Sequence, residues 1–155
     1  MTSRSYSGIP GAPGADFAWD DANIPAEELT WLKADLAAKK LPTIVLTHQP
    51  LNRLEQVDPA YTTAHTVRNA ADARAILEKS GVVIAVFSGH YHEGGFQQVG
   101  DISYVTLKAN VVHGCCVPYH NQYATVDVYK DGKEYQVVVA GHGGMRDYVF
   151  STVLP

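Results

Sequence analysis

Two stretches of the chain place their apolar residues at helical spacing. In residues 25–40, three leucines recur on one face, acidic residues lie in the first turn and lysines lie in the last, which predicts an amphipathic helix packed on a sheet. Residues 69–80 predict a second helix, with Asn69 as its N-terminal cap and Gly81 at its end. Both helices precede short apolar runs, so the pattern alternates between helix and strand.

The residues after each helix show the apolar patterns that are typical of strands, either continuous apolar runs or alternation of apolar and polar residues. Residues 43–47 and 82–87 are rich in Val and Ile, which is typical of strands buried on both faces. Because a helix connects them, the right-handed crossover rule predicts that these two strands are parallel. Residues 96–105 predict a hairpin, residues 123–139 predict a second and stronger one, and residues 148–153 predict a final short strand.

The order of these elements predicts an α/β fold. We expect a mixed sheet with a parallel βαβ N-terminal part and an antiparallel C-terminal meander. With 155 residues, 46% of them hydrophobic, the chain is long enough for one domain with a substantial core. We therefore expect a single domain over residues 1–155, in which the Gly- and Pro-rich residues 1–22 form an arm or loop.

Charge and hydropathy exclude several classes of function. The net charge of −4 at pH 7 and the lack of a basic stripe argue against a dedicated nucleic-acid or membrane-surface binder. No apolar run approaches the length of about 18 residues that a membrane-spanning helix needs, and the N-terminus lacks the layout of a secretory signal. The expected location is therefore cytoplasmic.

Histidines follow both of the predicted parallel strands. His48 comes directly after residues 43–47, and His90 and His92 follow residues 82–87 in the sequence Ser-Gly-His-Tyr-His. In an extended chain, residues two apart point the same way, so His90 and His92 can converge on one point. Ligands bind beyond the carboxyl ends of parallel strands. His48 would therefore lie at the same edge of the sheet as His90 and His92. The three imidazoles predict a metal site, whereas the His-x-His pair alone is equally compatible with two loop histidines.

These two strand-histidine motifs, Thr-His-Gln-Pro and Ser-Gly-His-Tyr-His, resemble the C-terminal half of calcineurin-like metallophosphoesterases. The strongest likeness is to the branch that acts on nucleotide diphosphates and cyclic nucleotides, and it covers residues 5–128. The resemblance implies that His48 and His90 bind one metal and that His92 binds a second. It also implies a small phosphoester substrate and a two-sheet sandwich with helices outside.

The N-terminal motifs of that family are absent from this chain. In the family, Asp-x-His, Gly-Asp-x-x-Asp and Gly-Asn-His-Asp/Glu supply a bridging aspartate, an asparagine ligand and a proton-donating histidine. Here Gly100-Asp101 lacks the second aspartate, and no Asn-His pair occurs. One chain therefore offers at most a mononuclear histidine site. Imidazole ligands favour Mn, Fe or Zn at such a site and are also compatible with Cu or Ni.

Two functions of different classes follow from these motifs. The first is a metal-dependent phosphoesterase, weak and broad, that favours activated aryl phosphodiesters because the proton donor is missing. The second is a non-catalytic metal-binding or interaction domain, a truncated remnant of a metallophosphoesterase. Without the family's first strands, a sheet edge near residues 43–47 would be exposed, so we expect a homodimer or a higher homo-oligomer.

Several other residues could contribute to a site. His113 could complete the ligand set from a loop, although a loop or core histidine is the favoured interpretation. Tyr61 and His65 could line a pocket, but for His65 an exposed loop position is the favoured interpretation. Cys115 and Cys116 could offer soft ligands, yet a metal site usually spaces its thiols by two or more residues, so a structural role is favoured.

Overall fold

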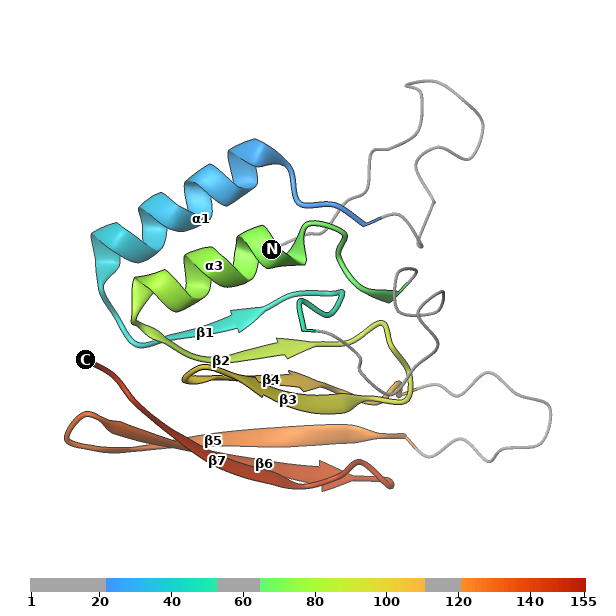
Figure 1. The fold of residues 1–155 in the computed structure, drawn as a ribbon. Coiled ribbons are helices and arrows are strands. Elements are labelled where there is room, and N and C mark those ends of the chain that lie inside the picture. Colours follow the sequence, from blue (N-terminus) through green and yellow to red (C-terminus); the bar gives the residue numbers. More distant parts are fainter. Residues whose placement is uncertain (1–21, 53–64, 111–120) are drawn as a thin grey trace, which may run out of the picture.

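The computed structural model describes residues 22–52, 65–110 and 121–155, and these residues form three layers (Figure 1). Two helices cover one face of a four-stranded mixed sheet, and a three-stranded antiparallel sheet covers the other face. This architecture confirms the predicted α/β fold, and it shows that the predicted meander forms a sheet of its own. The arm predicted for residues 1–22 lies almost entirely outside the described residues.

The helical layer consists of α1 (Ala26–Lys39) and α3 (Ala70–Ser80). Leu32 and Leu36 of α1 are buried against the sheet, as the spacing of the leucines predicts. The helix α3 ends at Gly81, whose φ of 65° lies in the left-handed region that glycine adopts without strain. No helix in the described part of the chain is long and apolar enough to cross a membrane.

Asn69 stands at the predicted N-cap position of α3, but its side chain does not cap the helix. Its side chain makes no cap hydrogen bond to α3, and instead it binds the backbone of Ile24 twice. The Ile24 N–H donates to Asn69 Oδ1 at 2.9 Å, and Asn69 Nδ2 donates to the Ile24 carbonyl at 2.9 Å. Because Ile24 is buried, its backbone groups need such partners. Asn69 therefore ties the segment before α1 to the start of α3.

The mixed sheet has the strand order β1-β2-β4-β3. Its strands are β1 (Thr43–Leu46), β2 (Val83–Ser88), β3 (Gly95–Val99) and β4 (Ile102–Thr106). As predicted, β1 and β2 are parallel, and β3 and β4 form an antiparallel hairpin. Strand β4 also pairs parallel with β2, which places β2 in the centre. Every residue of β2 is buried, because helices cover one face and the second sheet covers the other.

The second sheet has the strand order β5-β6-β7. Its strands are β5 (Tyr123–Asp131), β6 (Glu134–His142) and β7 (Tyr148–Val153), in agreement with the predicted meander. Alternate residues of β6 are buried, and Val137 and Val139 pack against Ile84 and Phe87 of β2. This contact forms the interior of a two-sheet sandwich.

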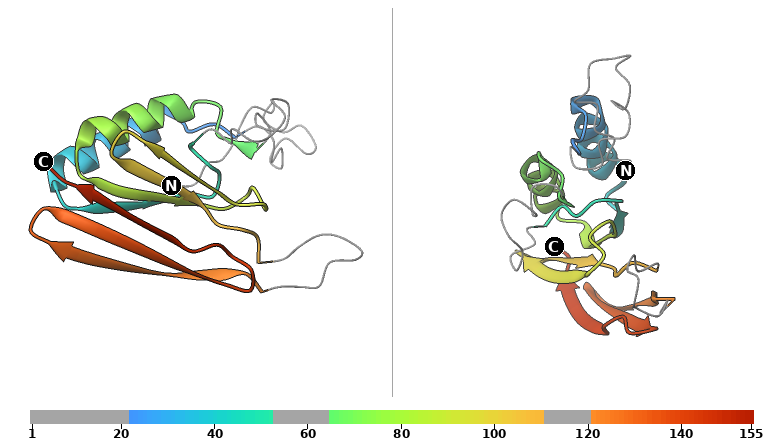
Figure 2. Two further views of the ribbon diagram at one scale, coloured as in Figure 1. Left: turned by 60° about the horizontal axis from the view of Figure 1, so that its bottom comes forward. Right: turned by 90° about the vertical axis from the view of Figure 1, so that its right-hand side faces the viewer.

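Aromatic side chains close one flank of the sandwich. Phe96 of β3 stacks on Tyr148 of β7, with ring centroids 5.2 Å apart, and contacts Phe150 at 5.7 Å. Strand β3 therefore lies over β7. The remaining edge strands, β1 and β5, lie on the opposite flank, where the two sheets diverge (Figure 2).

Candidate metal centre

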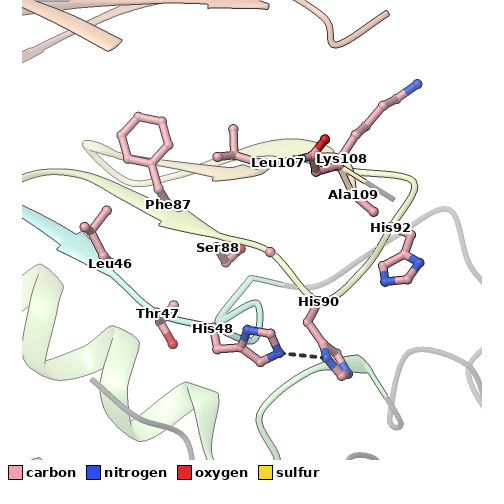
Figure 3. A pocket seen from close by; sticks show the side chains of 12 residues that line it. Leu46, Thr47, His48, Phe87, Ser88, His90, His92, Leu107, Lys108 and Ala109 are labelled. Carbon is pink, nitrogen blue, oxygen red and sulfur yellow. Dashed lines mark hydrogen bonds between the residues drawn. The ribbon is translucent and has the colours of Figure 1, made fainter. Parts of the chain in front are cut away.

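Two neighbouring loops carry the predicted site residues at the carboxyl ends of β1 and β2. The Thr47 N–H donates to the Phe87 carbonyl at 3.0 Å, and the Gly89 N–H donates to the His48 carbonyl at 3.0 Å. These bonds extend the parallel pairing of β1 and β2 beyond the strands themselves. They hold His48 and the loop containing His90 side by side (Figure 3).

The imidazoles of His48 and His90 meet at the carboxyl ends of β1 and β2, and we call this place the histidine rim. His48 Nε2 and His90 Nδ1 are 3.2 Å apart, within hydrogen-bond distance. Two imidazole nitrogens bound to one tetrahedral ion, with bonds of about 2.0–2.1 Å, lie roughly 3.3 Å apart. The separation between these two nitrogens therefore fits a shared divalent cation as well as it fits a hydrogen bond.

The route by which His90 reaches the rim differs from the prediction. The strand β2 ends at Ser88, and His90 has a φ of 63°, in the left-handed region where a non-glycine residue is uncommon. The Tyr91 N–H donates to the Gly89 carbonyl at 2.7 Å, which makes the turn tight. The expectation that His90 and His92 converge through strand alternation is therefore wrong. A turn, rather than extended chain, directs His90 toward His48.

His92 lines the same cavity as His48 and His90 but reaches it from further along the turn (Figure 3). Its carbonyl accepts a hydrogen bond of 3.1 Å from the Ala109 N–H, which anchors this part of the turn to the segment after β4. The three histidines predicted as ligands thus border one cavity. Of these, His48 and His90 contact each other through their ring nitrogens.

His65 is a residue that the sequence interpretation placed wrongly. It is half-buried rather than exposed, and its ring lies 5.6 Å from the His90 ring and 5.6 Å from the Tyr91 ring. No motif or spacing in the sequence indicates this contact, because His65 follows a polar stretch with no periodic pattern. The fold brings it to the rim because it lies just before α3.

The environment of the His90 imidazole favours its neutral form. The pKa of the His90 imidazole is lowered from 6.5 to about 4, first by burial and then by repulsion from neighbouring imidazoles, which are those of His48, His65 and His92. Burial disfavours the charged form, and additional positive charge disfavours it further. At neutral pH His90 therefore carries a nitrogen lone pair that can bind a cation.

The cavity beside these histidines has a volume of about 500 Å³ and two unlike walls. One wall carries the three imidazoles, and the other carries Leu46, Phe87 and Leu107 (Figure 3). No acidic residue is among the described residues that line the cavity. The cavity can therefore hold a ligand with a metal-binding end and an apolar end.

The described residues contain no group of three or more His, Cys, Asp or Glu side chains arranged to hold a metal ion. The predicted ligand set His48, His90 and His92 therefore stays a prediction. The other candidates Tyr61, His113, Cys115 and Cys116 lie outside the described residues.

Comparison with known proteins supports the fold. No family model matches the sequence, and no curated protein matches it. A solved dimetal phosphatase from Danio rerio is similar in structure, with 19% identity and a TM-score of 0.62 over 85% of this chain and 39% of that chain. A Vps29 single mutant from Entamoeba histolytica matches with 14% identity and a TM-score of 0.33 over 97% of this chain and 96% of that chain. The chain thus has a metallophosphoesterase-like fold and spans about two fifths of the dimetal phosphatase.

Proposed function

We propose that this chain is a metal-dependent phosphoester hydrolase that binds one divalent cation through His48, His90 and His92. The observation that carries the proposal is the 3.2 Å separation between His48 Nε2 and His90 Nδ1 at the carboxyl ends of two parallel strands. Ligand sites of α/β sheets lie at this position. The similar solved structure is described as a dimetal phosphatase, which supports a phosphoester as substrate.

The histidines have the properties that a metal site requires. A neutral imidazole is a ligand for Mn, Fe or Zn and also for Cu or Ni, and burial keeps His90 neutral. His92 borders the same cavity and would supply the third nitrogen. When bound, a divalent cation supplies Lewis-acid polarisation of a phosphoryl oxygen and lowers the pKa of a water. Since none of the described lining residues is acidic, we propose one ion rather than two.

The apolar wall of the cavity supports a preference for aryl or nucleotide substrates. Leu46, Phe87 and Leu107 form a surface on which a planar apolar group can lie while a phosphate faces the histidines. Nucleobases and nitrophenyl groups both have this shape. Activated aryl phosphodiesters suit the site best, because their leaving groups depart without a proton donor. Within the fold, we place the chain with enzymes that act on nucleotide diphosphates and cyclic nucleotides.

The lack of an acidic side chain among the described residues that line the cavity favours a second candidate function, because it leaves no carboxylate to bridge two metal ions. In that case the chain is a non-catalytic domain that binds a metal or a partner at the histidine rim. Metal binding would then occur without turnover.

The test compares an aryl with an alkyl phosphodiester. The purified protein is stripped with a chelator, Mn²⁺ or Zn²⁺ is added back, and hydrolysis of bis(4-nitrophenyl) phosphate and of diethyl phosphate is followed. We expect slow, metal-dependent hydrolysis of the aryl ester only, and loss of at least about tenfold in His48→Ala. His142→Ala is the matched control, because His142 stacks on Tyr123 and does not line the cavity. Efficient turnover of the alkyl ester would contradict a mononuclear site, and no metal-dependent turnover of either ester would favour the non-catalytic domain.

A further inference from the structure

The cavity beside the histidine rim has a cation on its second wall. Lys108 is the only lysine, arginine, aspartate or glutamate among the described residues that line this cavity. It is half-buried, and no carboxylate of the described lining residues neutralises its ammonium. An ammonium beside apolar walls attracts an anion more strongly than it would in open water. The cavity therefore offers an anionic ligand a contact besides the histidine rim.

Two consecutive backbone N–H groups fix the position of Lys108. The Lys108 N–H donates to Sδ of the buried Met145 at 3.4 Å, which ties the residue to the second sheet. The next N–H, that of Ala109, donates to the His92 carbonyl at 3.1 Å, which ties it to the turn that carries His92. The backbone of Lys108 is thereby held at a fixed place relative to the histidine rim.

The methylene stem of Lys108 packs over Gly94. A Cβ atom at position 94 would lie 2.8 Å from Lys108 Cγ and 2.9 Å from the Thr106 carbonyl oxygen, which is too close for either contact. The φ of Gly94 is 69°, a conformation that glycine adopts without strain. The missing side chain at Gly94 thus leaves room for the stem, while the charged end of a lysine packed in this way stays accessible.

The ammonium of Lys108 points away from the imidazoles (Figure 3). Lys108 follows Leu107 on the wall opposite the three histidines, and both walls border the same cavity. An anion bound by this ammonium is therefore a different group from a phosphoryl group held by a metal ion at the histidine rim.

We propose that Lys108 is a specificity-determining residue that binds a second negatively charged group of the substrate. This inference rests on the proposed function, in which the metal ion binds the phosphoryl group that is cleaved. Lysine binds phosphate as a compact charge with three donors on a flexible stem. The preferred substrate class is then a phosphoester with a further phosphate beside the one that reacts, whereas a substrate with one phosphate gains nothing from Lys108.

The test compares AMP with ADP, which share a nucleoside and differ by one phosphate. Binding of each to the full chain is measured by isothermal titration calorimetry with Mn²⁺ in excess, for the wild type, Lys108→Met and Lys108→Arg. We expect the wild type to bind ADP more tightly than AMP. Lys108→Met should weaken ADP binding at least about tenfold and AMP binding less than about twofold. Lys108→Arg should retain most of the preference for ADP, because it keeps the positive charge.

Lys130→Met is the matched control. The Lys130 ammonium lies 5.8 Å from the centre of the Tyr135 ring, and Lys130 does not line the cavity. This variant should bind ADP as the wild type does. Metal content, measured by mass spectrometry, should be equal in all four proteins, so that a change in ADP affinity is separated from a loss of the metal ion.

Three results would overturn the inference and leave Lys108 as a solvated surface lysine. They are equal affinities of the wild type for AMP and ADP, an unchanged ADP affinity in Lys108→Met, and equal losses in Lys108→Met and Lys130→Met. Hydrolysis separates this inference from the proposed function. A preference for ADP that depends on Lys108, without turnover of bis(4-nitrophenyl) phosphate, would reject the hydrolase and keep the anion contact. Metal-dependent turnover without a preference for ADP would keep the hydrolase and reject the role of Lys108.

Discussion

The two flanks of the sandwich are built from similar strands, yet in the described part of the chain large side chains close only one of them. On the closed flank, Phe96 of β3 reaches across the interior to Tyr148 and Phe150 of β7. On the flank of β1 and β5, which we call the open flank, β1 is only four residues long, and Val126 and Val128 of β5 are 39% and 42% exposed. Closure thus depends on large side chains that span the gap between the sheets. Where such side chains are missing, apolar surface stays exposed among the described residues.

The largest effect is expected from a valine that the sandwich covers completely. Val139→Ala removes two methylene equivalents from a fully buried position of β6 and leaves a cavity, so we expect a loss of about 2–3 kcal/mol in the free energy of unfolding. Urea unfolding followed by circular dichroism measures it. A loss below that of an exposed valine would show that the interior between the sheets is not tightly packed.

A smaller effect is expected from the aromatic contact on the closed flank. Phe96 is 42% exposed, so Phe96→Ala removes the ring stack on Tyr148 and only part of a full burial. We expect a loss of about 1–2 kcal/mol. Phe96→Leu should recover part of this loss, because it restores apolar contact without the aromatic stack. Identical unfolding midpoints for Phe96→Ala and the wild type would mean that the flank is not closed by this contact.

The smallest effect is expected on the open flank. Val126 lies directly opposite Val139 on the ladder, but it is only partly covered by the described residues. We expect Val126→Ala to cost less than about 0.5 kcal/mol in the free energy of unfolding, measured by urea unfolding beside Val139→Ala. Equal losses for Val126→Ala and Val139→Ala would remove the contrast between the flanks.

Much of the fold follows from local patterns of the sequence. The unbroken Val and Ile run of β2 predicts a central strand, and the alternation along β5 and β6 predicts their hairpin. The parallel pairing of β2 with β4 and the separation of the meander into a second sheet are not predicted, because both depend on long-range packing. The role of Asn69 was also not predictable, since its partner Ile24 lies far away in the sequence.

The candidate site could be predicted only in part. The placement of His48 and His90 at one rim follows from the rule for parallel strands, and their 3.2 Å contact agrees with it. No sequence pattern predicts the left-handed turn at His90, because a residue other than glycine rarely adopts this conformation. His65 was misjudged because no local pattern places a loop histidine beside a residue far along the chain.

The central claim is that His48, His90 and His92 bind one metal ion together. It is tested most directly by the metal content of the purified protein, measured by mass spectrometry for the wild type, His48→Ala and the control His142→Ala. We predict one divalent ion per chain in the wild type and in His142→Ala, and a large loss of metal in His48→Ala, because three imidazoles suffice for one site only when all are present. Full metal occupancy in His48→Ala would contradict this account.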